Sequence, residues 1–411
     1  MRVLVVGKGG REHAIADKLS KSPLLRGLWV APGNPGMQLQ GLTCVNIESP
    51  GALVDFSVSN NIDLVVVGPE AMILSDLKAR LAEKAIPCFS PDATVARLEA
   101  SKLFCKEVLI QAEVPTARFK LALTLEEAHA FISQHNFESP LVVKADGLAS
   151  GKGVSVCKTL DSTLHAANEL SHAYGFPLLL EECLIGQELS AFALCDGEDF
   201  VVLGTACDYK RITPDLFSAN TGGMGAFSPC DFISEEDTQK IESYFARTLQ
   251  VLKKRGQPYQ GFLFAGLMKT HKDLYVLEYN VRMGDPETQA LLPRLESDLL
   301  EVILMATKHQ LKDVRLKHTS QSAVHVVVAS QGYPDIRMSL GHKITTPTTS
   351  SQAQLYFAGV ASDGKNLINS GGRVLGVTSL GETRQQAREK AYSVVQQVQF
   401  QGHYYRQDIG E

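Results

Sequence analysis

The sequence predicts an α/β fold that continues into α+β units, because two patterns divide it. Over roughly the first hundred residues, short unbroken apolar runs alternate with helical stretches, a pattern typical of a doubly wound parallel sheet. From about Ser101 onward, strand-like runs instead come in pairs around glycines, which favours antiparallel sheets. We therefore expect an N-terminal doubly wound parallel sheet, a central α+β unit and a small C-terminal α+β domain.

The N-terminal unit, residues 1–100, contains four short apolar runs that indicate buried strands. They are Val3–Val6, Leu28–Ala31, Leu64–Val67 and the weaker Pro87–Ser90. Helical stretches lie between them, at Arg11–Ser20 and Ala71–Lys84. Continuous apolar strands separated by helices indicate that helices cover both faces of this sheet.

The central unit, residues 101–308, has hairpin-like strand pairs, and we expect a lid subdomain at about 115–185. The pairs are Leu141–Lys144 with Val154–Cys157, and Leu189–Cys195 with Phe200–Ala206. A polar linker, Lys308–Gln321, leads to the C-terminal domain, residues 320–411. Strand-like runs there are Ala323–Ser330, Gln354–Gly359 and Arg373–Thr378. An amphipathic helix is predicted at Thr383–Val398, capped by Thr383.

Composition excludes several classes of protein. The chain has 411 residues, 44% of them hydrophobic, and a net charge of -5, which gives no general attraction to nucleic acid or anionic membrane. Eight cysteines are scattered without a CxxC pair, so we expect reduced thiols. The N-terminus resembles a buried strand rather than a signal peptide, and no apolar run approaches the roughly 20 residues that span a bilayer. We expect a cytoplasmic protein, a monomer or weak dimer, with small-molecule substrates.

The first glycine-rich turn, Gly7–His13, follows a strand and opens a helix, which suits an anion at the helix N-terminus. It fails the dinucleotide fingerprint, because Glu12 occupies the third glycine position and no acidic residue ends the second strand. We expect Gly9, Gly10, Arg11 and Glu12 to bind a phosphorylated substrate. A purely structural turn is the alternative.

The central glycine-rich loop, Gly147–Gly153, carries lysines and glycines that suit phosphate binding. It is not a P-loop, because three residues separate its glycines, Gly153 replaces the Ser or Thr, and a strand follows. We expect a flap that closes over a triphosphate. A mobile hairpin with incidental lysines is the alternative. Downstream, Glu181 and Glu182 end an apolar strand, where they could meet adenine and ribose or be solvated.

The strand Leu274–Asn280 predicts a metal site. Alternate residues share one face of a strand, so Glu278, Asn280 and Arg282 point together. Two oxygen ligands and a guanidinium suit magnesium bound to phosphates, although a solvated polar face would look the same. A third glycine-rich loop, Asn220–Gly225, follows Asp208–Arg211 and offers amides and cations to an anionic substrate.

Several ordered motifs resemble the phosphoribosylamine–glycine ligase family of the ATP-grasp superfamily. They run from the first strand to near the C-terminus, and their order and rough spacing also fit. The motifs are Gly9–Ala14, Ala31–Asn34, Val67–Glu70, Lys144–Ala149, Asn220–Gly225, Gly284–Gln289 and Gly371–Leu375.

The resemblance implies a central ATP-grasp fold and a specific reaction. ATP would phosphorylate the carboxylate of glycine, and the amine of 5-phosphoribosylamine would attack the glycyl phosphate. The products would be glycinamide ribonucleotide, ADP and phosphate, in de novo purine synthesis.

The resemblance also implies roles for individual residues. For ATP these are Lys102, Lys144, Gly147, Gly151, Lys152, Gly153, Glu181, Glu182, Leu184 and Glu188. Glu278 and Asn280 would bind Mg²⁺ or Mn²⁺, and Arg282 would stabilise charge on the transferred phosphoryl group. Asp285 and Glu287 would act beside it in the substrate site, with Asp208, Lys210, Asn220, Thr221, Gly222 and Gly223.

The chain departs from the family pattern at several positions. Lys8, Ser90, Ala100 and Ala219 replace the expected asparagine, glycines and proline, and the segment His165–Pro177 is short. Two alternatives therefore stay open: a carboxylate–amine ligase with another substrate, and a nucleotide-binding protein without turnover. Retention of Lys144, Glu278, Asn280 and Arg282 argues against the second.

Overall fold

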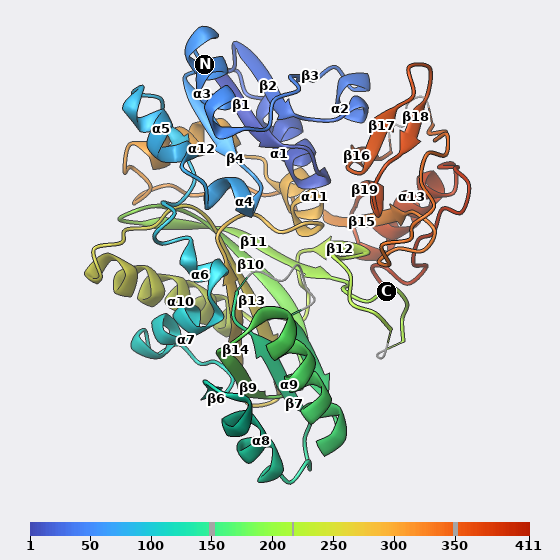
Figure 1. Ribbon diagram of the computed structural model, residues 1–411. Coiled ribbons are helices and arrows are strands. Elements are labelled where there is room, and N and C mark those ends of the chain that lie inside the picture. The colour runs from blue at the N-terminus through green and yellow to red at the C-terminus, as the bar shows by residue number, and fades with distance from the viewer. Residues whose placement is uncertain (148–152, 216–217, 348–351) are drawn as a thin grey trace.

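The computed structural model describes residues 1–147, 153–215, 218–347 and 352–411 (Figure 1). Gly151 and Lys152 of the predicted flap lie outside these residues. The N-terminal unit has the expected parallel sheet, in the order β3-β2-β1-β4-β5. Its strands are β1 (Arg2–Gly7), β2 (Gly27–Pro32), β3 (Thr43–Cys44), β4 (Leu64–Val67) and β5 (Cys88–Phe89).

Five helices connect these strands: α1 (Gly10–Ser20), α2 (Pro35–Leu39), α3 (Pro50–Ser59), α4 (Glu70–Ile73) and α5 (Leu77–Glu83). The single helix expected at Ala71–Lys84 is wrong, because two helices occupy this range. Ser75 explains the break: its hydroxyl donates to Met72 O and accepts from the amide of Leu77. A serine that bonds the local backbone in this way competes with helical hydrogen bonds.

The centre of the molecule is an eight-stranded sheet in the order β14-β13-β10-β11-β12-β15-β19-β16. Its first five strands in the chain are β10 (Gln187–Asp196), β11 (Phe200–Asp208), β12 (Gly225–Ser228), β13 (Gln260–Lys269) and β14 (Leu274–Asn280). The expected hairpin of Leu189–Cys195 with Phe200–Ala206 is confirmed as β10 and β11. The helices that follow in this part are α10 (Glu235–Lys254), α11 (Glu287–Leu291), the 3₁₀ turn Leu292–Arg294 and α12 (Leu299–Thr307).

A separate four-stranded sheet, in the order β6-β9-β7-β8, forms the lower part of Figure 1. Its strands are β6 (Phe119–Ala122), β7 (Leu141–Ala145), β8 (Val154–Cys157) and β9 (Leu178–Glu182), with helices α8 (Leu125–Ser133) and α9 (Leu160–Tyr174). The expected pairing of Leu141–Lys144 with Val154–Cys157 is confirmed. Helices α6 (Arg97–Ala100) and α7 (Lys102–Gln111) join this part to the N-terminal unit.

Three strands of the C-terminal residues extend the large sheet. β12 pairs with β15 (Ser322–Ala329), which pairs with β19 (Arg373–Gly381), and β16 (Gln354–Phe357) forms the edge. β17 (Val360–Ser362) and β18 (Leu367–Asn369) make a small hairpin. Helix α13 (Arg384–Val395) confirms the predicted helix, and the Thr383 hydroxyl accepts from the amide of Gln386 as its cap.

The cysteine expectation is partly wrong, because Cys207 and Cys230 form a disulfide. β11 and β12 pair antiparallel with Cys207 opposite Phe227, so the chain returns past Cys207 and brings Cys230 within a Cα–Cα distance of 6.1 Å. That separation lies in the range a disulfide spans. The other six cysteines are free. Among the described residues, no helix is both long and apolar enough to cross a membrane.

Candidate active site

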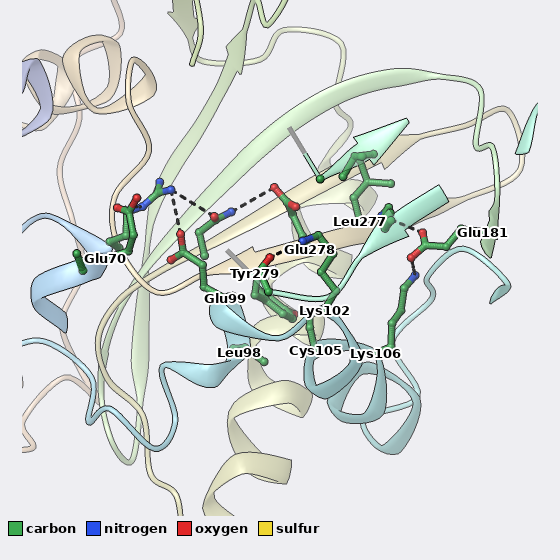
Figure 2. Close-up of a pocket in the computed structure, with 17 residues that line it drawn as sticks. Glu70, Leu98, Glu99, Lys102, Cys105, Lys106, Glu181, Leu277, Glu278 and Tyr279 are labelled. Carbon is green, nitrogen blue, oxygen red and sulfur yellow. Dashed lines mark hydrogen bonds and ion pairs between the residues drawn. The ribbon is translucent and has the colours of Figure 1, made fainter. Parts of the chain in front are cut away.

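A cavity of about 410 Å³ lies between the four-stranded sheet and the large sheet, beside α6 and α7. It brings together charged residues from distant parts of the chain (Figure 2). Its charged and amide-bearing lining residues are Glu70, Glu99, Lys102, Lys106, Lys144, Glu181, Glu278, Asn280 and Arg282. Gly147 and Gly153, the two described ends of the predicted flap, also line it.

Two predicted phosphate ligands, Lys102 and Lys144, reach this cavity from different elements. Lys102 begins α7, and its Nζ donates to Gly147 O at 2.8 Å. Lys144, on β7, lies with its Nζ 2.9 Å from Glu181 Oε2. Burial lowers the pKa of Lys102, with Glu278 opposing the shift. Two lysines that reach the cavity from different elements suit contact with phosphate oxygens.

Glu181 lies in the cavity wall, but its carboxylate is already paired. It is 2% exposed and lies between Lys144 and Lys106, whose Nζ is 3.3 Å from Oε1. Glu182 points away, since successive strand residues face opposite sides of a sheet, and it pairs with Arg118. Glu182, Leu184 and Glu188 are not among the residues that line the cavity. Their role as nucleotide ligands stays a prediction.

Glu278 and Asn280 lie side by side on β14, as the alternation predicts. Asn280 Nδ2 donates to Glu278 Oε1 at 3.5 Å. Burial would raise the pKa of Glu278, but Lys210, Lys144 and Lys102 hold it below its usual value. An ionised carboxylate and an amide oxygen fit Mg²⁺, which often takes one or two protein ligands and completes its shell with phosphates and water.

The strand beside β14 offers no further carboxylate, because Gly266 on β13 is the residue opposite Glu278. A Cβ at Gly266 would lie 3.3 Å from Glu278 Cγ, so the glycine leaves the glutamate its room. The described residues hold no group of three or more His, Cys, Asp or Glu side chains arranged for a metal.

Arg282 is held by two carboxylates, Glu70 and Glu99, to which the sequence interpretation gave no role; Glu70 stands in the Val67–Glu70 motif, and Glu99 had no sequence signal. Its Nη2 lies 3.0 Å from Glu99 Oε1 and its Nε 3.4 Å from Glu70 Oε2. Nη2 also approaches Asn280 Oδ1 at 3.5 Å. Glu99 comes from α6 and Glu70 from α4, so residues outside the large sheet fix this guanidinium beside Glu278 and Asn280.

A second polar cluster lies at the end of β11. Lys210 forms an ion pair with Glu188, and Ser190 Oγ donates to Glu287 Oε1 at 3.0 Å. Burial raises the pKa of Asp208, with Glu287 and Glu188 adding to the shift and Lys210 opposing it. Burial would lower the pKa of Lys210, but Glu188 and Asp208 raise it. The cluster suits a zwitterion or an amine that carries a proton.

The N-terminal turn and the loop before α11 meet beside this cluster. Glu12 Oε2 accepts from the amide of Gly9 at 2.8 Å, and Arg11 Nη1 donates to Met283 O at 3.3 Å. A Cβ at Gly9 would lie 3.5 Å from Asp285 Oδ2. The turn predicted to bind a phosphorylated substrate therefore adjoins Asp285.

Asp285 and the Asn220–Gly225 loop share a cation, Arg373. Arg373 Nη1 donates to Gly222 O at 2.6 Å and to Asp285 O at 2.7 Å, and lies 3.3 Å from Asp285 Oδ1. Burial would raise the pKa of Asp285, but Arg373 and Arg11 hold it below its usual value. Arg373 stands in the Gly371–Leu375 motif, which was the only sequence signal for it. Lys106 had no such signal.

Comparison with known proteins adds three family matches. Residues 1–99 match the model described as phosphoribosylglycinamide synthetase, N domain, residues 100–288 its ATP-grasp (A) domain, and residues 323–411 its C domain. The chain is 39% identical over 416 residues to the phosphoribosylamine–glycine ligase of Rhizobium meliloti, covering 100% of this chain and 98% of that protein. It is 38% identical to the one from Caldanaerobacter subterraneus, covering 100% and 99%.

Solved structures give the same picture. The crystal structure of phosphoribosylamine–glycine ligase from Thermotoga maritima superimposes with a TM-score of 0.86 at 36% identity over 100% of both chains. The biotin carboxylase domain of Hydrogenobacter thermophilus 2-oxoglutarate carboxylase, solved with MgADP, gives a TM-score of 0.74 at 16% identity, covering 98% of this chain and 91% of that one. This second likeness is one of fold, and both confirm the predicted architecture.

Proposed function

Because the chain belongs to the phosphoribosylglycinamide synthetase family, we propose that it joins glycine to 5-phosphoribosylamine at the expense of ATP, through a glycyl phosphate. The family makes it a ligase that forms a carbon–nitrogen bond in purine biosynthesis. The observation that supports the proposal best is the meeting of Lys102, Lys144, Glu278, Asn280 and Arg282 in one cavity.

The triphosphate would lie among Lys102, Lys144, Gly147 and Gly153, with Gly151 and Lys152 as further proposed ligands. Phosphate oxygens would take over part of the pairing that Lys144 now makes with Glu181. Adenine and ribose would lie toward Glu181, Glu182, Leu184 and Glu188. Glu278 and Asn280 would hold Mg²⁺ or Mn²⁺, which supplies charge neutralisation for the transferred phosphoryl group.

Phosphoryl transfer depends mainly on position and charge. The glycine carboxylate oxygen attacks the γ-phosphorus, and the bond to the β,γ-bridging oxygen breaks to release ADP. Arg282 faces the cavity from beside Asn280, so its guanidinium stabilises the charge that develops on the equatorial oxygens.

In the second step, the amine of 5-phosphoribosylamine attacks the glycyl carbon, and inorganic phosphate leaves. The substrates would be held by Asp208, Lys210, Asn220, Thr221, Gly222 and Gly223, with Asp285 and Glu287 beside them and the turn of Gly9, Gly10, Arg11 and Glu12 nearest the ribose phosphate. The attacking amine loses a proton, which the carboxylate of Asp208 or Glu287 would accept. The expected cytoplasmic location and the monomeric or weakly dimeric state stay predictions.

The direct test supplies ATP, Mg²⁺, glycine and 5-phosphoribosylamine made in situ, and follows ADP and glycinamide ribonucleotide. Both products are expected in equal amounts. ADP formation with another acid, but not with glycine, would favour a ligase of changed specificity. ATP binding without turnover for any acid would favour a nucleotide-binding protein instead.

The metal assignment is tested by Glu278→Gln, which keeps the size of the side chain and removes its charge. At limiting Mg²⁺ the variant should turn over at least about tenfold more slowly, and added Mg²⁺ should restore part of the rate. Glu242→Gln, on the exposed face of α10, is the matched control and should behave like the unmodified protein. A normal rate for Glu278→Gln at limiting Mg²⁺ would contradict the assignment.

A further inference from the structure

We propose that residues 404–411 hold the substrate-binding strand end in place, with Arg406 and Tyr209 as positioning residues for Asp208 and Lys210. The inference rests on the proposed function, because it assumes that Asp208 and Lys210 bind substrate. It concerns residues that belong neither to the ATP cavity nor to the substrate cluster.

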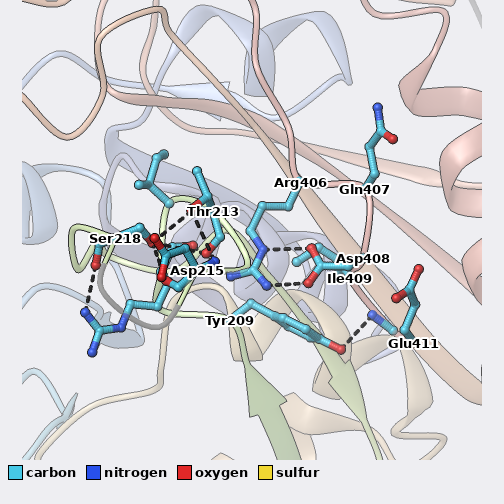
Figure 3. A network of polar contacts seen from close by, with 12 residues as sticks. Tyr209, Thr213, Asp215, Ser218, Arg406, Gln407, Asp408, Ile409 and Glu411 are labelled. Carbon is cyan, nitrogen blue, oxygen red and sulfur yellow. Dashed lines mark hydrogen bonds and ion pairs between the residues drawn. The ribbon is translucent and has the colours of Figure 1, made fainter.

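The argument begins with the alternation of side chains around Tyr209. Asp208 and Lys210 belong to the polar cluster with Glu188 and Glu287. Neighbouring residues of an extended chain point to opposite sides, so Tyr209 points away from that cluster. Its ring lies against the C-terminal residues (Figure 3). A contact on Tyr209 therefore sets the position of the two flanking side chains without touching a substrate.

Residues 404–411 contact this strand end at four points. Arg406 Nη1 donates to Arg211 O at 2.9 Å, and its guanidinium lies 5.1 Å from the centre of the Tyr209 ring. The amide of Gly410 donates to Tyr209 Oη at 2.9 Å, and Tyr404 Oη donates to Ile212 O at 2.8 Å. All four contacts fall within two residues of Lys210.

Arg406 is itself held in one orientation. Its side chain is 6% exposed, its Nε donates to Asp408 Oδ1 at 2.8 Å, and its Nη2 lies 2.5 Å from Asp408 Oδ2 (Figure 3). A bidentate pair of this kind fixes the plane of the guanidinium. Because Asp408 also neutralises the charge of Arg406, the effect on the substrate cluster is one of position rather than of long-range field.

The held strand end and residues 404–411 also contact the Asn220–Gly225 loop. The amide of Met224 donates to Tyr209 O at 2.8 Å, and the amide of Thr221 donates to Lys210 O at 2.7 Å. Ile409 packs on Gly225, where a Cβ would lie 2.7 Å from Ile409 Cγ2. Residues 404–411 therefore hold both ends of the loop that offers amides to the substrate.

If residues 404–411 only packed against the strand end, their loss would affect the protein differently from the loss of a positioning role. Loss of packing lowers stability and affects every substrate alike. Loss of positioning weakens the contacts of Asp208, Lys210 and the Asn220–Gly225 loop most. Residues 404–411 line no part of the proposed ATP cavity, so their loss reaches ATP only indirectly, through the pair of Lys210 with Glu188. The KM values of ATP, glycine and 5-phosphoribosylamine therefore distinguish the two roles.

The test compares Arg406→Ala, Arg406→Lys and Tyr209→Phe with the unmodified protein and with Arg337→Ala. Arg337 is an exposed arginine of the same C-terminal part, paired with Asp335. For Arg406→Ala we expect the KM of glycine or of 5-phosphoribosylamine to rise about tenfold, with the KM of ATP within threefold. Arg406→Lys should recover part of the loss, since it keeps the charge without the directed bonds. Tyr209→Phe, which loses only the bond from Gly410, should show a smaller rise.

Hydrogen exchange provides a readout that needs no turnover. In Arg406→Ala, the amides of Tyr209 and Met224 should exchange faster, while those of β1 stay unchanged. Unchanged exchange and unchanged KM values would overturn the inference, and so would an equal rise in the KM of all three substrates. The unmodified protein is assayed first: if it forms no glycinamide ribonucleotide, the proposed function fails, while the exchange result still decides whether residues 404–411 hold the strand end.

Discussion

At the scale of single residues, the arrangement around Arg282 shows how neighbouring carboxylates fix the orientation of a guanidinium. Glu99 is 7% exposed on its side chain, and besides pairing with Arg282 it accepts from the amide of Val281 at 2.8 Å. Burial raises the pKa of Glu99, with Arg282 opposing the shift. A buried ion pair fixes geometry, and Glu70 still pairs with Arg282 when Glu99 is lost, so we expect the loss of Glu99 to show in turnover.

Glu99→Gln should lower kcat about tenfold and change the KM of ATP by less than threefold, because the guanidinium stays present but loses its charged partner. Steady-state kinetics at saturating glycine measure both values. Glu107→Gln, on the exposed face of the adjoining helix α7, controls for a loss of surface charge. A kcat for Glu99→Gln within twofold of the control would contradict the aiming role.

At the scale of elements, helix α1 is joined to strand β16 through a neutral histidine. His13 is fully buried; its Nδ1 accepts from the amide of Phe357 at 2.9 Å, and its Nε2 lies 3.1 Å from Gln40 Oε1. Burial lowers the pKa of His13 to about 4. These contacts give His13 a structural role between the helix and the strand.

This junction predicts acid sensitivity. The folded-state pKa of His13 lies below its unfolded value, so the unfolded chain binds more protons between about pH 6.5 and pH 4, and stability falls as the pH drops through that window. At pH 5 the expected loss from His13 is about 2 kcal/mol relative to pH 7. Thermal unfolding between pH 7 and pH 5 measures it.

The control for this prediction is a histidine on the surface. His13→Gln should flatten the dependence of the unfolding temperature on pH, whereas His271→Gln, at an exposed position between β13 and β14, should leave it unchanged. An equally steep loss of stability in His13→Gln would show that other groups cause the acid sensitivity.

At the scale of the whole molecule, the large sheet contains strands from both sides of the predicted linker. β12 pairs with β15 over four residues, and residues 404–411 bond the end of β11. The predicted boundary near residues 308–320 therefore separates parts of the sequence that share one sheet (Figure 1). Paired strands and a common core should keep the two parts together after the chain is cut.

A recognition site for a specific protease inserted after Asp313, which is exposed, tests this. After cleavage, the two pieces should elute together in size-exclusion chromatography and separate only in guanidinium chloride. The same variant before cleavage is the control. Separation in native buffer would show that the shared sheet does not hold the parts together.

Local sequence patterns correctly predicted the features that depend on residues close together in the chain. The unbroken apolar runs gave the parallel strands, Thr383 gave a helix cap, and the alternation after Leu277 placed Glu278 beside Asn280. The sequence interpretation did not predict contacts between residues that lie far apart in the chain. Glu99 and Glu70 meet Arg282 only once three parts of the chain have folded, and Cys207 meets Cys230 only through the pairing of β11 with β12. No spacing in one sequence encodes those meetings.

The order of the large sheet's strands along the chain also determines which of its contacts can form first during translation. Every residue that lines the cavity of the candidate active site precedes Met283, so all of them have been synthesised before β15 exists. Until β15 emerges, β12 has an unpaired edge, which is a known hazard for association with other chains. The residues that hold Tyr209 come later still, from 404 onward. During translation the nascent chain therefore has all the residues that line the cavity well before residues 404–411 can hold the end of β11 in place.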